Sequence, residues 1–387
     1  MSGEEKVLVG SYEFRCSNCG APLEVSPETI VAVCSYCGYP NWIREDLKSE
    51  IMIVEALSES KITARARERI KTDRDLKKIA SAITLGKPLL VYIPYYFADA
   101  AAEADYWGRV RVTMRRCTGS GKERKCYTNT HIVTVSGHYG PFRKEYSIIG
   151  RRAVKAFSAK ALGEYYLDKK PEPKPLEKIR LEKSTTRRIL NVEVDQKTAI
   201  DIALDEHLDT LRARVEAEIR HRAERKADMM YPGTVVSSTI ISKRIKPKNI
   251  DVKVSPITLL PLYIMPYRYG NGVYRLFLSG WDGITIVAEE PMTLFHRILY
   301  GSAGTLVAGG AGGLAGAMFY SGSGELAIAG ALVLLFGAAI SYYTIRMATR
   351  PVRVEVVNER FKSLKEIAGK TYGIYKKIHR YTKYVGI

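Results

Sequence analysis

Two cysteine motifs specify the structure of the first part of this 387-residue chain: Cys16-Ser-Asn-Cys19-Gly20 and Cys34-Ser-Tyr-Cys37-Gly38. In each, two cysteines two residues apart form a turn that aims both sulfurs at one ion, and the following glycine lets the backbone curl beneath it. Two disulfides or four unrelated thiols are the alternatives, and the matched turns favour metal. The spacing predicts a zinc ribbon over 1–45 whose structural Zn²⁺ is held by Cys16, Cys19, Cys34 and Cys37.

We expect the predicted zinc site to have a structural role and not a catalytic one. A stretch this short buries little core of its own, so bound metal would supply much of its folding free energy. Four protein thiolates leave no coordination position for water. Gly119-Ser-Gly-Lys122 resembles a phosphate-binding loop, but Arg116 and Glu123 stand where that motif needs Gly and Ser/Thr. We find no catalytic motif and predict a protein that is not an enzyme.

The composition is strongly basic. The formal net charge is +19 and the pI is about 9.5. This balance favours nucleic acid, anionic lipid or an acidic protein as partner, without choosing between them. The chain has one Gln and seven Asn beside many Lys, Arg and Glu, a composition that fits a thermophile, such as a thermophilic archaeon.

Two uncharged stretches, 298–320 and 326–343, follow closely on one another near the C-terminal end. A membrane-spanning helix needs about 20 mainly apolar residues, so the pair predicts a transmembrane helical hairpin over 296–346. The alternative is a pair of buried helices in a large soluble core. Gly309 and Gly313, like Gly312 and Gly316, have the small-x-x-x-small spacing that lets helices approach closely. Packing on the second span and oligomerisation through the bilayer both remain open.

The basic residues around the hairpin predict its orientation. His296 and Arg297 precede the first span, cations also follow the second, and the turn at 321–325 contains no Lys or Arg. The positive-inside rule therefore places both termini in the cytoplasm of a two-span cell-membrane protein. Residues 1–10 lack the apolar core of a signal peptide, which agrees with a cytoplasmic N-terminus. We expect 347–387 to be a basic amphipathic cytosolic tail lying on anionic headgroups, with nucleic-acid contact as the alternative.

Residues 46–295 predict a cytosolic α+β body. Ile62, Ala66 and Ile70 mark one face of a basic helix, and 197–227 has the periodicity of a long helix with His207 on its packing stripe. Alternating patterns predict two antiparallel β units, 85–165 and 232–292, which share a Tyr-Ile-x-x-Tyr-like segment. Cys117 and Cys126 fall opposite one another in a hairpin, either reduced or disulfide-bonded.

The order of motifs over about 12–295 resembles a known family. After the ribbon come Tyr92-Ile-Pro-Tyr-Tyr96, a long helix, Leu260-Pro-Leu-Tyr263, and a hairpin ending in Ser279-Gly-Trp-Asp-Gly283. This order is similar to that of the transcription-factor-IIB-type zinc-ribbon proteins of prokaryotes, often labelled as like primosomal replication factor Y. The resemblance implies zinc on the four cysteines and nothing catalytic. The apolar hairpin and basic tail are additions to the family pattern.

These observations predict a membrane-anchored, zinc-stabilised scaffold or adaptor that binds a partner protein, with self-association through the spans as an option. The absence of catalytic motifs and the aromatic β segments support this function. The alternative is a membrane-tethered protein that binds nucleic acid or the ribosome, because zinc ribbons are common in such proteins and the chain is basic.

Overall fold

The computed structural model describes residues 14–73, 75–119, 124–152, 157–179, 187–292, 294–320, 324–349 and 352–356. As predicted, the protein is α+β with antiparallel sheets. The chain forms two compact units, each built from two segments: Met1–Glu55 with Tyr92–Leu260, and Ala56–Val91 with Pro261–Ile387.

This division differs from the predicted one, in which a ribbon at 1–45 preceded a body at 46–295. The reason is that two strands, β7 (Leu89–Thr118) and β12 (Ile257–Tyr269), each run from one unit into the other. The periodicity of a strand indicates its faces but not which segments pair with it.

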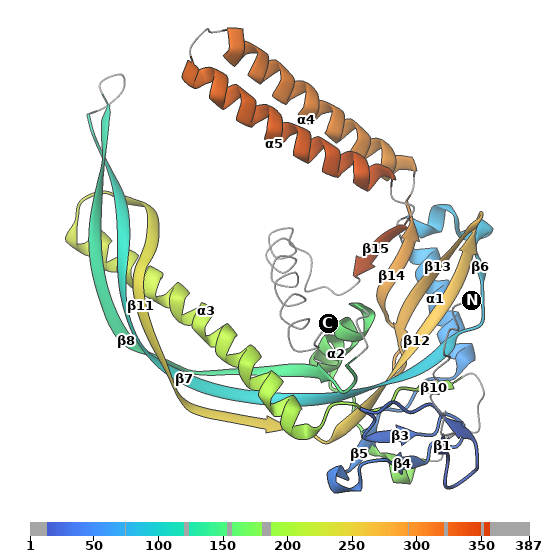
Figure 1. Cartoon of the computed structure of the whole chain (residues 1–387). Coiled ribbons are helices and arrows are strands. Elements are labelled where there is room, and N and C mark those ends of the chain that lie inside the picture. Colours follow the sequence, from blue (N-terminus) through green and yellow to red (C-terminus); the bar gives the residue numbers. More distant parts are fainter. Residues whose placement is uncertain are drawn as a thin grey trace, which may run out of the picture. The chain divides into compact units, whose positions relative to one another are not determined.

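The first unit contains the cysteine ribbon and a long layered structure (Figure 1). Its helices are α2 (Phe157–Lys169) and α3 (Gln196–Met230), with short 3₁₀ turns η1 (Glu45–Leu47) and η5 (Leu176–Lys178). Beside β7, its strands are β1 (Phe14–Arg15), β2 (Pro22–Leu23), β3 (Val31–Val33), β4 (Pro40–Trp42), β5 (Ile51–Ile53), β8 (Lys125–Ile149), β9 (Lys174–Pro175), β10 (Arg187–Ile189) and β11 (Thr234–Val254).

Strands β7, β8 and β11 form a bent antiparallel sheet with β7 in the middle, from Ala98↔Val254 near its base to Thr118↔Lys125 at its tip. Helix α3 lies along the inner side of the bend (Figure 1). We call these three strands and α3 the arm. The register shifts of β11, between Val235 and Ser237 for example, mark bulges, which bend and twist a strand.

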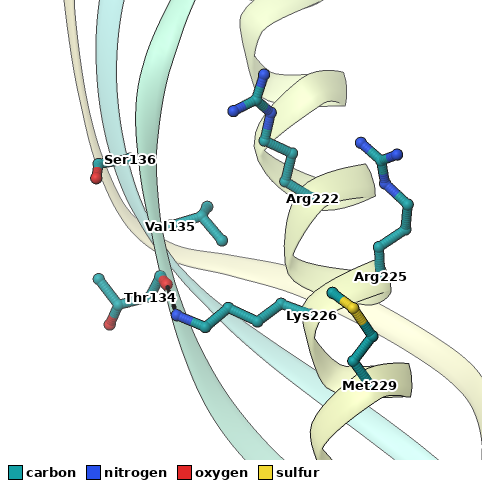
Figure 2. Close-up of a pocket in the computed structure, with 7 residues that line it drawn as sticks. All are labelled: Thr134, Val135, Ser136, Arg222, Arg225, Lys226 and Met229. Atoms are coloured by element: carbon teal, nitrogen blue, oxygen red, sulfur yellow. Dashed lines mark hydrogen bonds between the residues drawn. The ribbon is translucent and has the colours of Figure 1, made fainter.

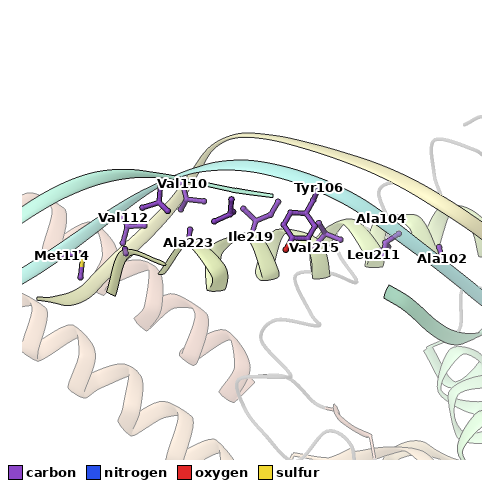
Figure 3. Close-up of a cluster of buried hydrophobic side chains, with 13 residues drawn as sticks. Ala102, Ala104, Tyr106, Val110, Val112, Met114, Leu211, Val215, Ile219 and Ala223 are labelled. Atoms are coloured by element: carbon purple, nitrogen blue, oxygen red, sulfur yellow. The ribbon is translucent and has the colours of Figure 1, made fainter. Parts of the chain in front are cut away.

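Alternation along β7 and helical spacing along α3 create the core of the arm (Figure 3). Every second residue of β7 faces α3, where residues four apart form the opposing stripe. At Gly108 the two elements approach so closely that a Cβ would lie 2.6 Å from Ile219 Cγ2. The buried residues are Ala102, Ala104, Tyr106, Val110, Val112, Met114, Val133, Val135, Leu211, Val215, Ile219, Ala223 and Ala227.

The predicted helix at 197–227 is confirmed as α3, which begins at Gln196 after Asp195, whose carboxylate accepts a hydrogen bond from the Thr198 amide at 2.6 Å. Within the β unit predicted over 85–165, the chain forms the single long strand β7, which pairs with β8. Cys117 and Cys126 pair directly across the hairpin and form a disulfide, which decides the alternative left open by the sequence.

The second unit is a β meander covered by a basic helix. As predicted, the helix α1 (Glu59–Thr72) buries Ile62, Ala66 and Ile70, here against a cluster that includes Tyr263 and Tyr267 of β12. The other elements are η2 (Leu76–Lys78), η3 (Ala80–Ala82), β6 (Thr84–Leu85), β13 (Gly272–Ser279), β14 (Thr285–Pro291), β15 (Val352–Val356), α4 (Leu294–Tyr320) and α5 (Gly324–Thr349).

The start of the predicted tail at 347–387 differs from the expected amphipathic helix. Residues Val352–Val356 form β15, which adds to β14 as an antiparallel edge strand. The alternation of Val352, Val354 and Val356 with charged residues suits a strand better than a helix. The stripe predicted from Val357 onward lies outside the described residues.

Helices α4 and α5 are long and apolar enough to cross a membrane, over Arg297–Tyr320 and Gly324–Ala348. Most of their apolar side chains are exposed in the structure, Leu306 at 76% and Phe336 at 69%, whereas those of a core helix are mostly buried. The two helices approach at Gly304 and Gly337, where a Cβ would lie 2.6 Å from Thr344 Oγ1 and 2.3 Å from Ala311 Cβ.

Candidate metal centre

Two short β hairpins position the four cysteines. Strands β1 and β2 flank the first cysteine turn, and β3 and β4 flank the second. The turns have the same backbone hydrogen bonds: Gly20 N donates to Cys16 O and Gly38 N to Cys34 O, both at 2.8 Å. Gly20 and Gly38 have φ of +72° and +78°, a left-handed conformation that glycine adopts without strain. The glycines of the sequence motif therefore have the predicted structural role.

The sulfur atoms of the four cysteines lie close together. All lie within 4.8 Å of one another, so Cys16, Cys19, Cys34 and Cys37 are brought together as predicted. Between the turns, Cys16 and Cys37 Sγ are 3.7 Å apart, and Cys19 and Cys34 Sγ are 3.8 Å apart. A tetrahedral ion with metal–sulfur bonds of about 2.3 Å holds its ligands ~3.8 Å apart. The cluster therefore has the dimensions of a four-thiolate metal site.

Two asparagines surround the sulfurs and were missed by the sequence reasoning. Asn41 Nδ2 donates to Cys16 Sγ at 3.5 Å, while its Oδ1 accepts from the Ser17 amide at 2.9 Å. Asn18 Nδ2 lies 3.7 Å from Cys37 Sγ. Each asparagine thus links one cysteine turn to the other, an arrangement that orients ligands and delocalises thiolate charge. In a chain so poor in amides, two in the ribbon were an available signal.

The environment of the thiols differs between the two turns. Burial disfavours the Cys16 thiolate, but hydrogen bonds from the Asn18 amide and the Asn41 side chain outweigh burial and lower the pKa to about 7. Burial raises the pKa of Cys34 to about 12. Four thiolates this close repel one another, so a cation is what allows all four to ionise together.

The second cysteine turn is fastened to the rest of the first unit. Arg187 is buried, and its Nε and Nη2 donate to the carbonyls of Ser35 and Tyr36, both at 3.2 Å. Val192 exchanges backbone hydrogen bonds with the segment at Ile30 and Val31. Burial lowers the pKa of Arg187, and the nearby Tyr92, Cys34 and Cys37 groups oppose that shift. The ribbon is therefore integrated into its unit instead of being suspended on a linker.

A basic pocket lies on the arm, between α3 and strand β8. Figure 2 shows Lys226 reaching from α3 to β8, where Nζ donates to the Thr134 carbonyl at 3.1 Å. Arg222 is held by Glu218 at 2.6 Å and lies over the Tyr106 ring. The lining contains cations and hydroxyls but no acid or nucleophile arranged for catalysis. Its residues are Thr134, Val135, Ser136, Arg222, Arg225, Lys226 and Met229.

His207 is a packing residue, as the sequence predicted, and it is fully buried. Its Nδ1 lies 3.1 Å from the Tyr146 hydroxyl, and its ring stacks on Phe142. Burial and the nearby Lys144 lower the pKa of His207, which keeps the ring neutral.

Comparison of the chain with protein-family models, curated proteins and solved structures found no match.

Proposed function

We propose that this protein is a membrane-anchored, non-catalytic scaffold whose metal-stabilised cytosolic body presents the arm to a partner. The observation that carries the proposal is the exposed apolar surface of α4 and α5. Helices of spanning length with outward-facing Leu306, Phe336 and Leu335 need a bilayer or a partner to cover them. Basic flanks favour a two-span topology with both termini in the cytoplasm.

The anchoring is tested by fractionation of cells that express the tagged chain. We expect the protein to stay in membranes washed with alkaline carbonate and to be released by detergent. A variant with Leu306, Leu335 and Phe336 replaced by Ser controls for adventitious association, and we expect it to be released by the wash. Release of the unaltered protein by carbonate alone contradicts anchoring.

We infer that the metal is zinc and that its role is structural. Four thiolates at tetrahedral separations fit Zn²⁺ and leave no position for water or substrate, so the metal would contribute folding free energy. Elemental analysis of the purified protein should give about one zinc per chain. Replacement of both Cys34 and Cys37 by Ser should abolish zinc binding, whereas replacement of both Cys117 and Cys126 by Ser should not.

Self-association is the further part of the scaffold proposal. A Cβ added to Gly309, Gly312, Gly313 or Gly316 would meet nothing within 4 Å among the described residues, so this face of α4 is not used by α5. A second copy of α4 could approach closely there. Size measurement in mild detergent should then show an oligomer, and a monomer contradicts this part alone.

A second candidate function, binding of nucleic acid, is favoured by a specific observation. The sheet of the arm has many arginines and no neighbouring carboxylates over its outer half, a surface that suits a polyanion better than an ordinary protein partner.

A further inference from the structure

The outer face of the arm, directed away from α3, has an arginine row along its central strand. Because Val110, Val112 and Met114 of β7 face α3, the alternating residues Trp107, Arg109, Arg111, Thr113 and Arg115 face outward. All three arginines are exposed. Alternate residues of a strand are ~7 Å apart, so the row extends over roughly 27 Å.

Hydroxyl groups border this row on both neighbouring strands. Arg109 lies between Thr134 of β8 and Ser242 of β11, and Arg115 lies between Thr128 and Thr234. Arg111 has Thr239 on one side and Ile132 on the other, and Arg244 lies beside Trp107. We call the outward-facing residues of these rows the distal face: Trp107, Arg109, Arg111, Thr113, Arg115, Thr128, Thr130, Ile132, Thr134, Ser136, Thr234, Ser237, Thr239, Ser242 and Arg244.

The distal face has a positive charge that no carboxylate on its strand segments neutralises. The three strand segments that carry it, 107–118, 125–136 and 234–244, contain seven Lys or Arg and no Asp or Glu. Within the part of the chain that the structure describes, Arg109, Arg111, Arg115 and Arg244 form no ion pair. Nearer the base of the arm the same sheet is neutralised, since Asp105 pairs with Lys248 and with His138 Nδ1, the latter at 3.0 Å.

An exposed aromatic ring accompanies the arginines. Trp107 is 40% exposed although it lies in the middle strand of the sheet, next to Ser136 and Arg244 in register. Guanidinium groups bind phosphates in bidentate fashion, hydroxyls donate to phosphate oxygens, and an indole face stacks on an unpaired base. This combination on a β-sheet surface is suited to a single strand, whose bases are free to stack.

We propose that the distal face binds single-stranded nucleic acid, with its phosphates on Arg109, Arg111 and Arg115 and a base on Trp107. The inference deepens the second candidate function, and it rests on the proposed membrane anchoring for the cytosolic location of the arm. A bilayer surface fits less well, because the bend puts this face on the convex side, away from α3 (Figures 1 and 3). A flexible strand follows a convex surface, whereas a planar bilayer touches it only locally.

The test uses the full chain in nanodiscs of neutral phosphatidylcholine and a fluorescent 20-nucleotide single strand of mixed sequence, as RNA and as DNA. Replacement of Arg109 and Arg111 together by Gln should weaken binding about tenfold or more at low salt. It should also reduce the slope of log affinity against log salt by roughly 1.4, since each lost phosphate contact contributes ~0.7 for single strands. Trp107→Ala should weaken binding about fivefold or more, and Trp107→Phe should retain most of it.

The matched control replaces Arg188 and Arg214 by Gln. Both are exposed arginines of the same unit that lie outside the distal face, so the loss of net charge is identical. Equal weakening by control and test variants would mean non-specific attraction and would overturn the proposal. Absence of binding by the unaltered protein would also overturn it, as would arginine-dependent binding of anionic vesicles but not of the single strand. Nanodisc incorporation is scored separately, so failure of membrane anchoring is distinguishable from failure of binding.

Discussion

Arg187 donates through Nε to the carbonyl of Ser35 at 3.2 Å, across 152 positions of sequence. This contact fastens the second cysteine turn to β10, so the stability of the ribbon and of its unit are coupled. Arg187→Ala should lower the free energy of unfolding by about 2 kcal/mol, because it leaves the part-buried carbonyls of Ser35 and Tyr36 without their charged donor. The melting temperature measures this effect. Arg188→Ala, at the exposed neighbouring position, should leave the melting temperature nearly unchanged. An equal fall in melting temperature in the two variants would contradict a coupling of the ribbon to its unit through Arg187.

The asparagine between the two cysteine turns predicts a change in metal affinity. Asn41→Ala removes the donor to Cys16 Sγ and the acceptor for Ser17, and loss of such an outer contact typically costs 10- to 100-fold in affinity. Competition with a chromophoric zinc chelator measures the affinity. Asn129→Ala, on the exposed hairpin of the arm, is the control. An affinity equal to that of the unaltered protein would show that Asn41 does not support the metal.

Metal removal should unfold the first cysteine hairpin but not the arm. The core between α3 and the sheet contains none of the four cysteines, whereas the hairpin of β1 and β2 buries only Cys16 among residues 14–23. After chelation, hydrogen exchange should become fast in 14–23 and remain slow in α3. Loss of protection throughout α3 would mean that the two parts unfold as one.

Two glycines of the hairpin should respond differently to a large side chain. Gly337→Leu places atoms where Ala311 already lies and should destabilise the contact of α4 with α5 by about 1–3 kcal/mol. Gly312→Leu meets open space and should leave the hairpin intact while weakening self-association. Protease resistance in detergent reports the hairpin, and cross-linking reports the oligomer. Loss of protease resistance in both variants would contradict this assignment.

His207 should make stability depend on pH in a narrow window. The folded pKa lies below the unfolded value of about 6.5, so folding is favoured above pH 6.5 and stability is lost as pH falls towards the folded pKa. His207→Gln cannot be protonated and should lack this component. The difference in melting temperature between the two proteins, measured from pH 7.5 to 5, should therefore change below pH 6.5. A constant difference would mean that His207 does not titrate on unfolding.

The metal cluster and the long helix could be predicted because their signals are local. Cysteine spacing fixes two turns, and the apolar stripe through Leu211, Val215 and Ile219 specifies one face of a helix. Antiparallel pairing within the β unit predicted over 232–292 is also confirmed for β12 to β14, where Gly270-Asn271-Gly272 provides a local turn signal. In each case neighbouring residues carry the information.

The β unit predicted over 232–292 contains β11, but the length and pairing of β11 and the asparagine contacts were missed because their causes are not local. Residues 234–254 are rich in the β-branched residues typical of strands, but the charged residues of 243–253 and Pro247 conceal how far the strand extends. Their pairing with β7 and the bulge-rich register stabilise them instead. Likewise, each unit is built from two separate chain segments because of the way the strands pair. Hydrophobic alternation does not indicate which strands pair with one another.

Labelling of an introduced cysteine with a membrane-impermeant maleimide shows whether the protein has a membrane anchor with a cytosolic body. Ser323→Cys introduces a thiol between the two apolar stretches of the sequence, and Ser136→Cys introduces one at an exposed position of the arm, with the unaltered protein as background. We expect labelling of the thiol of Ser323→Cys in intact cells and of the thiol of Ser136→Cys only after permeabilisation. Labelling of both only after permeabilisation, or of Ser136→Cys in intact cells, would contradict it.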